Sequence, residues 1–118
     1  MVKPMDKSIF LKTMGDYPLL RVLDFLMWSR DFDYPLTEIA TNSHVNFITF
    51  KKLWPRLEKE KIVKKTRKLG RSLLYRINEE NPIVQKLIEF NNAICWKAFD
   101  EQTVKESGKN TKKEVILH

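Results

Sequence analysis

Side chains that can bind phosphate are concentrated in one stretch of the sequence. Between Asn46 and Arg76 the chain holds 11 Lys and Arg residues and 2 acidic residues, a local balance of +9. The whole chain of 118 residues has a formal charge of +7, so the residues outside this stretch sum to −2. A strongly basic segment in an otherwise slightly acidic chain is typical of a surface that lies against polyphosphate. We therefore expect this stretch to contact nucleic acid.

One face of a predicted helix at residues 46–60 carries side chains that can recognise DNA bases. With a step of about 100° per residue, Ile48, Lys52 and Arg56 lie opposite the apolar stripe that contains Phe50. In a major groove, Ile can contact a thymine methyl group, Lys can bond a base edge, and Arg can donate two hydrogen bonds to guanine. A merely solvated helix is the alternative, because single exposed apolar residues are common. The residues expected to read bases are Phe47, Ile48, Thr49, Lys52 and Arg56.

A short basic hairpin is predicted directly after this helix. Residues 62–77 read as two strands and a loop, with Leu73, Tyr75 and Ile77 alternating on one face of the second strand. In the loop, Gly70 can supply the positive φ that a tight turn needs. An ordinary solvated hairpin, whose lysines deter edge-to-edge aggregation, is the alternative. The adjoining basic helix favours a hairpin that contacts nucleic acid.

The segment before the basic helix completes a helix-turn-helix pattern. Residues 35–40 predict a short helix with Thr37 as its N-cap. Residues 41–45 predict a tight turn that leads into Asn46, a good N-cap residue for the second helix. Two helices joined in this way, the second of them longer and basic, are typical of a DNA-binding helix-turn-helix. The basic hairpin that follows then reads as a wing.

The chain resembles the winged helix-turn-helix regulators of the MarR and ArsR type, and more closely the small archaeal proteins of this kind. The resemblance is carried by GDYPLLRVLDFL at residues 15–26, FDYPLTEIA at 32–40 and IVKKTRKLGRS at 62–72, and it spans residues 16–98. It implies a mainly α-helical fold with a small β-hairpin wing. The helix at 46–60 would lie in the major groove of double-stranded DNA, with the wing on the backbone or in the minor groove. The expected contacts to the DNA backbone, or from the wing, are Thr37, Lys51, Lys59, Lys65, Arg67, Lys68 and Arg71.

Two positions depart from the usual pattern of such regulators. His44 stands where the turn usually has Gly, and Lys61 stands where the recognition helix commonly ends in Gly. We expect a left-handed backbone at both positions, which costs a non-glycine residue about 1 kcal/mol or somewhat more. Neither departure changes the expected fold.

A long apolar helix is predicted after the wing, from Pro82 to about residue 106. Its apolar residues form two adjoining stripes, of which one can pack on the chain's own core and the other has no obvious internal partner. A two-fold homodimer would cover the second stripe, and Asn91 could fix the pairing register. A helix that simply folds back on the core is the alternative. The expected dimer interface consists of Val84, Leu87, Ile88, Asn91, Ile94, Cys95, Ala98 and Phe99.

The length and composition predict one small domain with additional terminal segments. Residues 16–80 form the winged helix-turn-helix domain, which begins with a strongly apolar helix, and residues 81–106 form the dimerisation helix. Residues 1–15 are an N-terminal segment that could pack on a partner subunit, with either a strand or a helix at 8–14. Residues 107–118 read as a flexible basic tail.

Catalytic and metal-binding patterns are absent from the sequence. The only histidines are His44 and His118, and the only cysteine is Cys95, too few for a His-based nucleophile system or a structural zinc site. We expect no enzyme activity, no cofactor and no metal. The apolar setting of Cys95 predicts a packed thiol. Because no apolar run approaches the roughly 18 residues of a membrane span and no signal-peptide pattern opens the chain, we expect a cytoplasmic protein without a membrane partner.

Three functions agree with these patterns. The first is a sequence-specific, double-stranded DNA-binding transcriptional regulator. The second is a winged-helix interaction module of a transcription or replication assembly, which would use the same basic surface without an operator of its own. The third is a small-molecule-responsive repressor, with a pocket between the dimer helices lined by Trp28, Trp96 and Phe99. The base-reading side chains on the helix favour the first function over the second.

Overall fold

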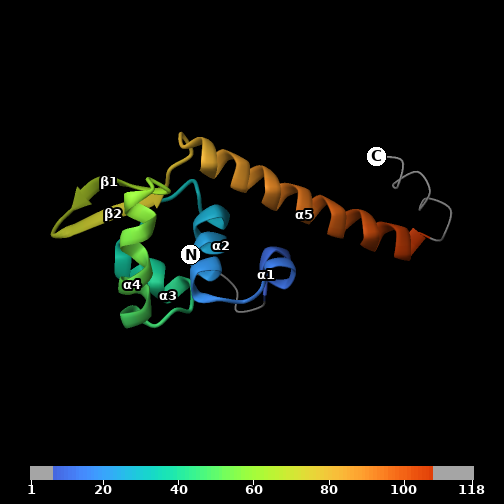
Figure 1. The fold of residues 1–118 in the computed structure, drawn as a ribbon, viewed down its shortest axis with the longest axis horizontal. Helices are drawn as coiled ribbons and strands as arrows, with labels where there is room; N and C mark the ends of the chain where they lie inside the picture. The colour runs from blue at the N-terminus through green and yellow to red at the C-terminus, as the bar shows by residue number, and fades with distance from the viewer. Residues whose placement is uncertain (1–6, 108–118) are drawn as a thin grey trace.

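The structure, a computed structural model, describes residues 7–107, and the side chains of residues 7–101. Figure 1 shows the order of the elements along the chain. The predicted basic tail lies outside the described residues, except for Ser107. The elements are α1 (Ile9–Met14), α2 (Pro18–Trp28), α3 (Leu36–Asn42), α4 (Phe47–Lys59), β1 (Val63–Leu69), β2 (Ser72–Ile77) and α5 (Pro82–Ser107). The expected mainly helical fold with one β-hairpin is confirmed.

Helix α2 lies at the centre of the core, as its apolar sequence predicts. It starts at Pro18, whose fixed φ suits the first helical position. Phe25 and Val22 are fully buried, and Phe25 packs against Tyr34 with their ring centroids 5.3 Å apart. The other helices and the hairpin surround this element. The largest fully buried side chains are Phe10, Val22, Phe25, Leu26, Met27, Ile39, Phe50, Ile77 and Val84.

Residues 8–14 of the N-terminal segment fold onto the chain's own core, whereas residues 1–6 lie outside the described residues. They form the helix α1, and the hydroxyl of its N-cap residue Ser8 accepts a hydrogen bond from the amide of Leu11. Phe10 and Leu11 are buried, and α1 contacts both α2 and α5. The expectation that this segment packs on a partner subunit is therefore wrong for these two residues, because they are already covered within one protomer.

The helix-turn-helix forms with one shifted boundary. Helix α3 begins two residues earlier than an N-cap at Thr37 would allow, because the carbonyl of Pro35 accepts the first helical hydrogen bonds. The prediction of Thr37 as the N-cap is therefore wrong. The turn does contain a left-handed residue, since His44 has φ 58°. Arg21 of α2 donates to the His44 carbonyl at 2.8 Å, which ties the turn to the central helix.

The hairpin carries an irregularity that the sequence reading did not anticipate. Gly70 has φ 64° in the tight turn, as predicted. Lys65 pairs with Tyr75 but the next pair is Arg67 with Leu74, so Thr66 is the extra residue of a β-bulge. Leu73 alternates with Tyr75 and Ile77 on one face of β2, as predicted, but it is exposed where the hairpin extends past the core, whereas Leu74 on the other face is buried. On the outer edge of β2, Tyr34 and Tyr75 exchange backbone hydrogen bonds of 2.8 and 2.9 Å.

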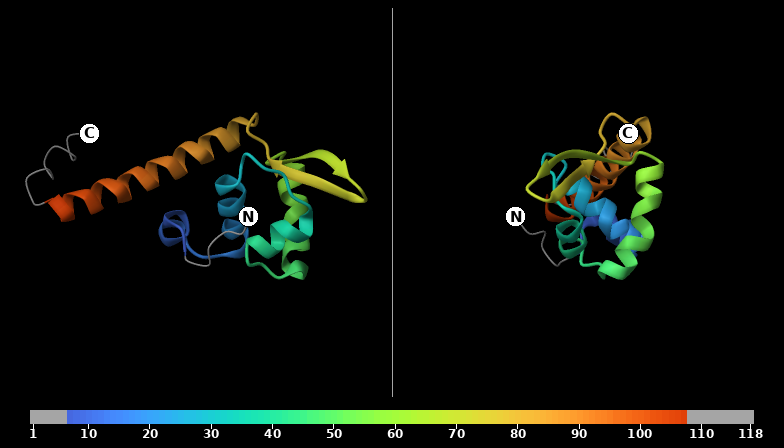
Figure 2. Two further views of the ribbon diagram at one scale, coloured as in Figure 1. Left: turned by 180° about the vertical axis from the view of Figure 1, so that it is seen from behind. Right: turned by 90° about the vertical axis from the view of Figure 1, so that its left-hand side faces the viewer.

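Helix α5 packs on the core through its first half and extends past α1 (Figure 2). Val84 is fully buried in the protomer's own core, so its assignment to the dimer interface is wrong. Leu87, Ile88 and Ile94 are partly buried against the same core. Leu87 and Ile94 belong to one of the two predicted apolar stripes and Val84 and Ile88 to the other, so the core contact uses residues from both stripes. Cys95 is exposed, which contradicts the expected packed thiol.

Replacing Lys61 with Gly should stabilise the fold relative to Ala at the same position. Lys61 has φ 57° directly after α4, where Gly avoids the Cβ clash of a left-handed residue. We expect Lys61→Gly to unfold with a free energy about 1 kcal/mol higher than that of Lys61→Ala in urea denaturation. Both variants lose the same charge, so equal stabilities would mean that no strain is stored here.

Candidate nucleic-acid interface

Helix α4 divides into a buried apolar face and an exposed basic face, as predicted. Phe50, Trp54 and Leu57 are buried, whereas Ile48 is 69% exposed. Asn46 caps the helix, because its side chain accepts a hydrogen bond from the amide of Ile48 at 2.8 Å. The exposed face presents Thr49, Lys51, Lys52, Arg56 and Lys59 to solvent.

Aromatic packing holds this helix to the hairpin. Phe47 stacks on Phe50 and Phe50 stacks on Trp54, with ring centroids 5.9 and 5.0 Å apart. Trp54 then meets Tyr75 of β2 edge to face, with their ring centroids 5.6 Å apart. Lys51 places its ammonium 5.7 Å from the centroid of the Phe47 ring. Phe47, expected to read bases, is therefore partly engaged with side chains of its own helix.

Two asparagines that the sequence reading missed hold the C-terminal end of α4. The last carbonyls of a helix lack partners within it. The side-chain amide of Asn81 donates to the carbonyls of Glu60 and Lys61, at 3.1 and 2.9 Å. The side-chain amide of Asn78 also donates to the Lys61 carbonyl, at 3.0 Å. Asn81 is also the N-cap of α5, since its side-chain oxygen accepts a hydrogen bond from the amide of Ile83.

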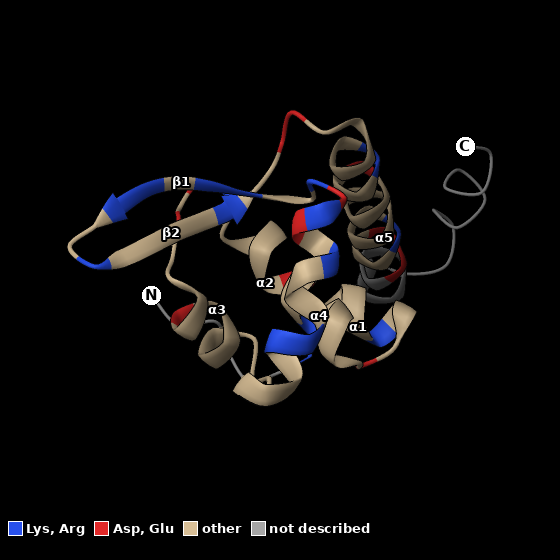
Figure 3. Ribbon diagram, turned by 60° about the vertical axis from the view of Figure 1, so that its left-hand side comes forward, with Lys and Arg blue, Asp and Glu red and all other residues tan. Residues whose placement is uncertain are grey.

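The wing brings basic residues into the same region as α4 (Figure 3). Lys65, Lys68 and Arg71 are exposed on the hairpin, as a DNA contact requires. Arg67 differs from them, because its guanidinium donates to both carboxylate oxygens of Asp33, with N to O distances of 3.1 and 3.2 Å. Hydrogen bonds from Arg67, and then from Thr66, hold the pKa of Asp33 below its usual value. Asp33 is therefore charged at neutral pH and pairs with Arg67.

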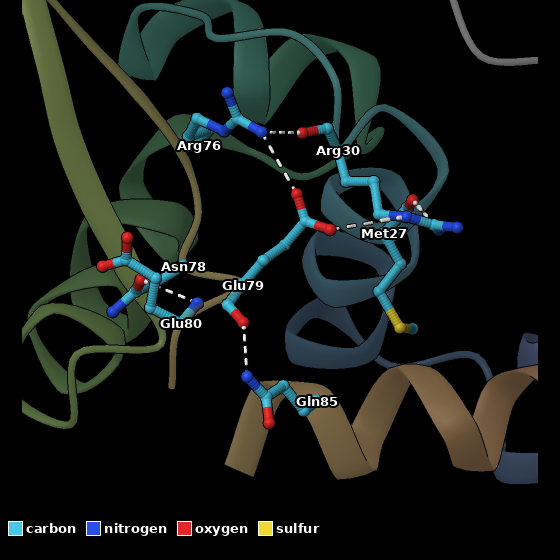
Figure 4. A network of polar contacts seen from close by, with 7 residues as sticks. All are labelled: Met27, Arg30, Arg76, Asn78, Glu79, Glu80 and Gln85. Atoms are coloured by element: carbon cyan, nitrogen blue, oxygen red, sulfur yellow. Dashed lines mark hydrogen bonds and ion pairs between the residues drawn. The ribbon is translucent and has the colours of Figure 1, made fainter. Parts of the chain in front are cut away.

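A polar network anchors the base of the wing to α2 and α5 (Figure 4). Arg76 of β2 donates to the backbone carbonyl of Arg30 at 2.7 Å and to the Glu79 carboxylate at 3.1 Å. The same carboxylate lies 3.8 Å from the guanidinium of Arg30. Gln85 in the first turn of α5 donates to the Glu79 carbonyl at 3.0 Å. Arg76 thus belongs to the scaffold and not to the exposed basic surface.

An ion pair between Arg21 and Asp16 supports the turn at residues 41–45. Arg21, which donates to the His44 carbonyl, also donates to the carboxylate of Asp16. This hydrogen bond from Arg21 is the main reason that the pKa of Asp16 is below its usual value. Asp16 thereby orients the arginine that supports the left-handed turn residue.

The exposed part of α5 carries an aromatic depression. Asn92, Cys95, Trp96 and Phe99 line it, and the rings of Trp96 and Phe99 meet edge to face with centroids 5.8 Å apart. Trp28 was expected beside these two rings, but it does not line the depression and lies near Phe25, with ring centroids 6.3 Å apart. The predicted effector pocket, which would lie between the α5 helices of two protomers, stays a prediction.

Among the side chains of residues 7–101, no group of three or more His, Cys, Asp or Glu could hold a metal ion. No helix within residues 7–107 is long and apolar enough to cross a membrane.

Comparisons with known proteins find similarity at the level of structure. No protein-family model and no curated protein matches the chain. Lactococcus lactis ZitR, a mutant in apo form, matches with a TM-score of 0.56 at 16% identity, over 82% of this chain and 74% of its own. The transcriptional regulator PA4135 matches with a TM-score of 0.56 at 18% identity, over 90% of this chain and 74% of its own. The antimony-specific transcriptional repressor AntR matches with a TM-score of 0.53 at 19% identity, over 85% of this chain and 97% of its own. The chain therefore has the winged-helix fold of these transcriptional regulators.

Proposed function

We propose that this protein is a sequence-specific transcriptional regulator that binds double-stranded DNA. Helix α4 lies in the major groove, and the wing, residues 62–77, lies on the backbone or in the minor groove. The observation that carries the proposal is the exposed basic face of α4 beside an exposed basic wing, with the opposite faces of both packed on one aromatic core. The structures of ZitR include a complex with DNA, which supports this use of the fold.

The side chains on α4 favour recognition of bases over charge attraction alone. Ile48, Lys52 and Arg56 project from one exposed face, so an apolar contact, a hydrogen-bond donor and a forked donor lie side by side. A module that only neutralises phosphate in an assembly has no use for the exposed Ile48. A closer relation to small archaeal winged-helix proteins stays a prediction.

Binding to duplex DNA should weaken steeply as salt increases. Each Lys or Arg that neutralises a phosphate contributes about 0.9 to the magnitude of the log-log slope of affinity against salt concentration. We expect a slope that reflects several such contacts when a labelled duplex is titrated between low and moderate salt. Undetectable or salt-insensitive binding would remove the proposed function.

Variants of α4 and of the wing should affect DNA binding in different ways. Arg56→Ala or Lys52→Ala should cost about 1–3 kcal/mol on the preferred site and relax the preference at one or two base pairs. Lys68→Ala should weaken binding to all sequences alike, because a phosphate contact carries no sequence information. Binding-site selection from random duplexes, followed by competition titrations, measures both effects. A uniform loss in all three variants would favour the assembly module.

We further propose that α5 joins two copies of the chain into a homodimer. Its exposed large hydrophobic residues are too many for a helix that faces solvent, since most soluble proteins leave only scattered apolar residues exposed. A two-fold pairing would place two recognition helices about 34 Å apart, one DNA turn, and so match a pseudo-palindromic site. The exposed residues are Ile83, Phe90, Trp96 and Phe99, at 59%, 45%, 65% and 58%.

A charge on the exposed face of α5 should separate the dimer without unfolding the protomer. Trp96 is 65% exposed and its ring meets only Phe99 among the described rings, so Trp96→Glu leaves the buried core of the protomer unchanged. Leu69→Glu is a matched control, because Leu69 is 62% exposed at the wing, away from α5. Sedimentation equilibrium at micromolar concentration should show dimers for the wild type and for Leu69→Glu, and monomers for Trp96→Glu. A monomeric wild type would contradict the arrangement.

A further inference from the structure

We propose that Arg67, although it is one of the wing's basic residues, does not contact DNA. Instead Asp33, Thr66 and Arg67 form a pin that sets which side chains of the wing face the nucleic acid. The proposal rests on the DNA binding proposed above and assigns positioning roles within it. It removes Arg67 from the wing residues that the sequence predicted to contact DNA, and keeps Lys65, Lys68 and Arg71.

The β-bulge determines the face on which each basic residue of β1 lies. Cross-strand partners share a face, and successive residues of a strand alternate between faces. Tyr75 faces α4, because its ring meets Trp54. Leu73 lies two residues from Tyr75 on the regular strand β2, so its partner Lys68 also faces the α4 side. Arg67 pairs with Leu74 and therefore lies on the opposite face.

Without the extra residue, the alternation along β1 would be reversed beyond Lys65. Residues 65, 67 and 69 would then share the α4 side, and Lys68 would face away. Because Thr66 is inserted, Lys68 lies on the same face of the wing as Tyr75, and Arg67 lies on the opposite face, where it pairs with Asp33. A register change of one residue is enough to move a charge from one side of the wing to the other.

Asp33 is placed to hold this irregular register. Its neighbour Tyr34 packs on Phe25 in the core and exchanges hydrogen bonds with Tyr75, so the connector from α2 runs along the outer edge of β2. From there the Asp33 carboxylate accepts hydrogen bonds from the Thr66 hydroxyl and from the Arg67 guanidinium. Both partners belong to the bulge, 33 and 34 residues further along the chain. The side chain of Asp33 is only 17% exposed, which limits competition by water.

The salt dependence of DNA binding distinguishes a positioning Arg67 from a contacting one. Arg67→Gln and Lys68→Gln remove the same charge from neighbouring residues. We expect Lys68→Gln to reduce the magnitude of the log-log salt slope by about 0.9. Arg67→Gln should leave the slope at the wild-type value, because it removes no phosphate contact and keeps the Thr66 hydroxyl, whose hydrogen bond to Asp33 still holds Lys68 in position. An equal loss of slope in both variants would overturn the proposal and leave the proposed function intact.

A neutral pair of variants tests the pin without changing charge. Thr66→Val loses the hydroxyl that Asp33 accepts from, whereas Thr66→Ser keeps it. We expect Thr66→Val to bind the preferred duplex several-fold more weakly and Thr66→Ser to bind like the wild type, with circular dichroism showing that both are folded. Equal binding by the two variants would overturn the role of the pin. A wild type that binds no duplex at all would overturn both this inference and the proposed function.

Discussion

The edge-to-face contact between Trp54 and Tyr75 is the interaction on which the basic surface depends. A stretch with a net charge of +9 repels itself, and that repulsion favours separation of the helix from the hairpin. The opposing attraction is apolar: Trp54 is 3% exposed and Tyr75 is 9% exposed, with Phe50 stacked behind them. Burial of an aromatic side chain stabilises a fold by about 1.5–3 kcal/mol. The packing of these buried aromatic rings therefore offsets the repulsion between the basic side chains that α4 and the wing expose.

The segment between the wing and α5 connects every part of the proposed interface. Asn81 caps the start of α5 with its oxygen and holds the end of α4 with its amide. Glu79 accepts from Arg76 at the base of the wing and lies beside Arg30 at the end of α2. A change in the direction of α5 would therefore act on α4 and on the wing through short hydrogen bonds. In a dimer joined by α5, the spacing of the two recognition helices would depend on these few contacts.

Local features of this fold could be predicted from the sequence, and long-range pairings could not. The N-cap at Asn46, the left-handed residues His44 and Lys61, and the buried stripe of α4 each follow from a few neighbouring residues, and all are confirmed. The β-bulge at Thr66 depends on how two strands pair, and Leu73 keeps the face of Tyr75 but lies where the hairpin extends past the core. The pairing of Asp33 with Arg67 joins residues that lie 34 positions apart in the sequence. Neither the identity of the two residues nor their separation in the sequence predicts that they pair. Such pairings depend on the tertiary arrangement of elements that are each predictable alone.

The length of α5 sets a geometric limit on what one protomer can cover. At about 1.5 Å per residue, its 26 residues span roughly 39 Å, about the diameter of a small domain or more. The core covers Val84 fully and Ile94 in part, whereas Cys95 lies on nearly the same side as Val84 and is exposed. The apolar surface therefore continues along the helix after the domain beneath it has ended. A second copy in the opposite orientation would extend the cover over that surface, so the same helix that completes one core would supply the interface of the pair.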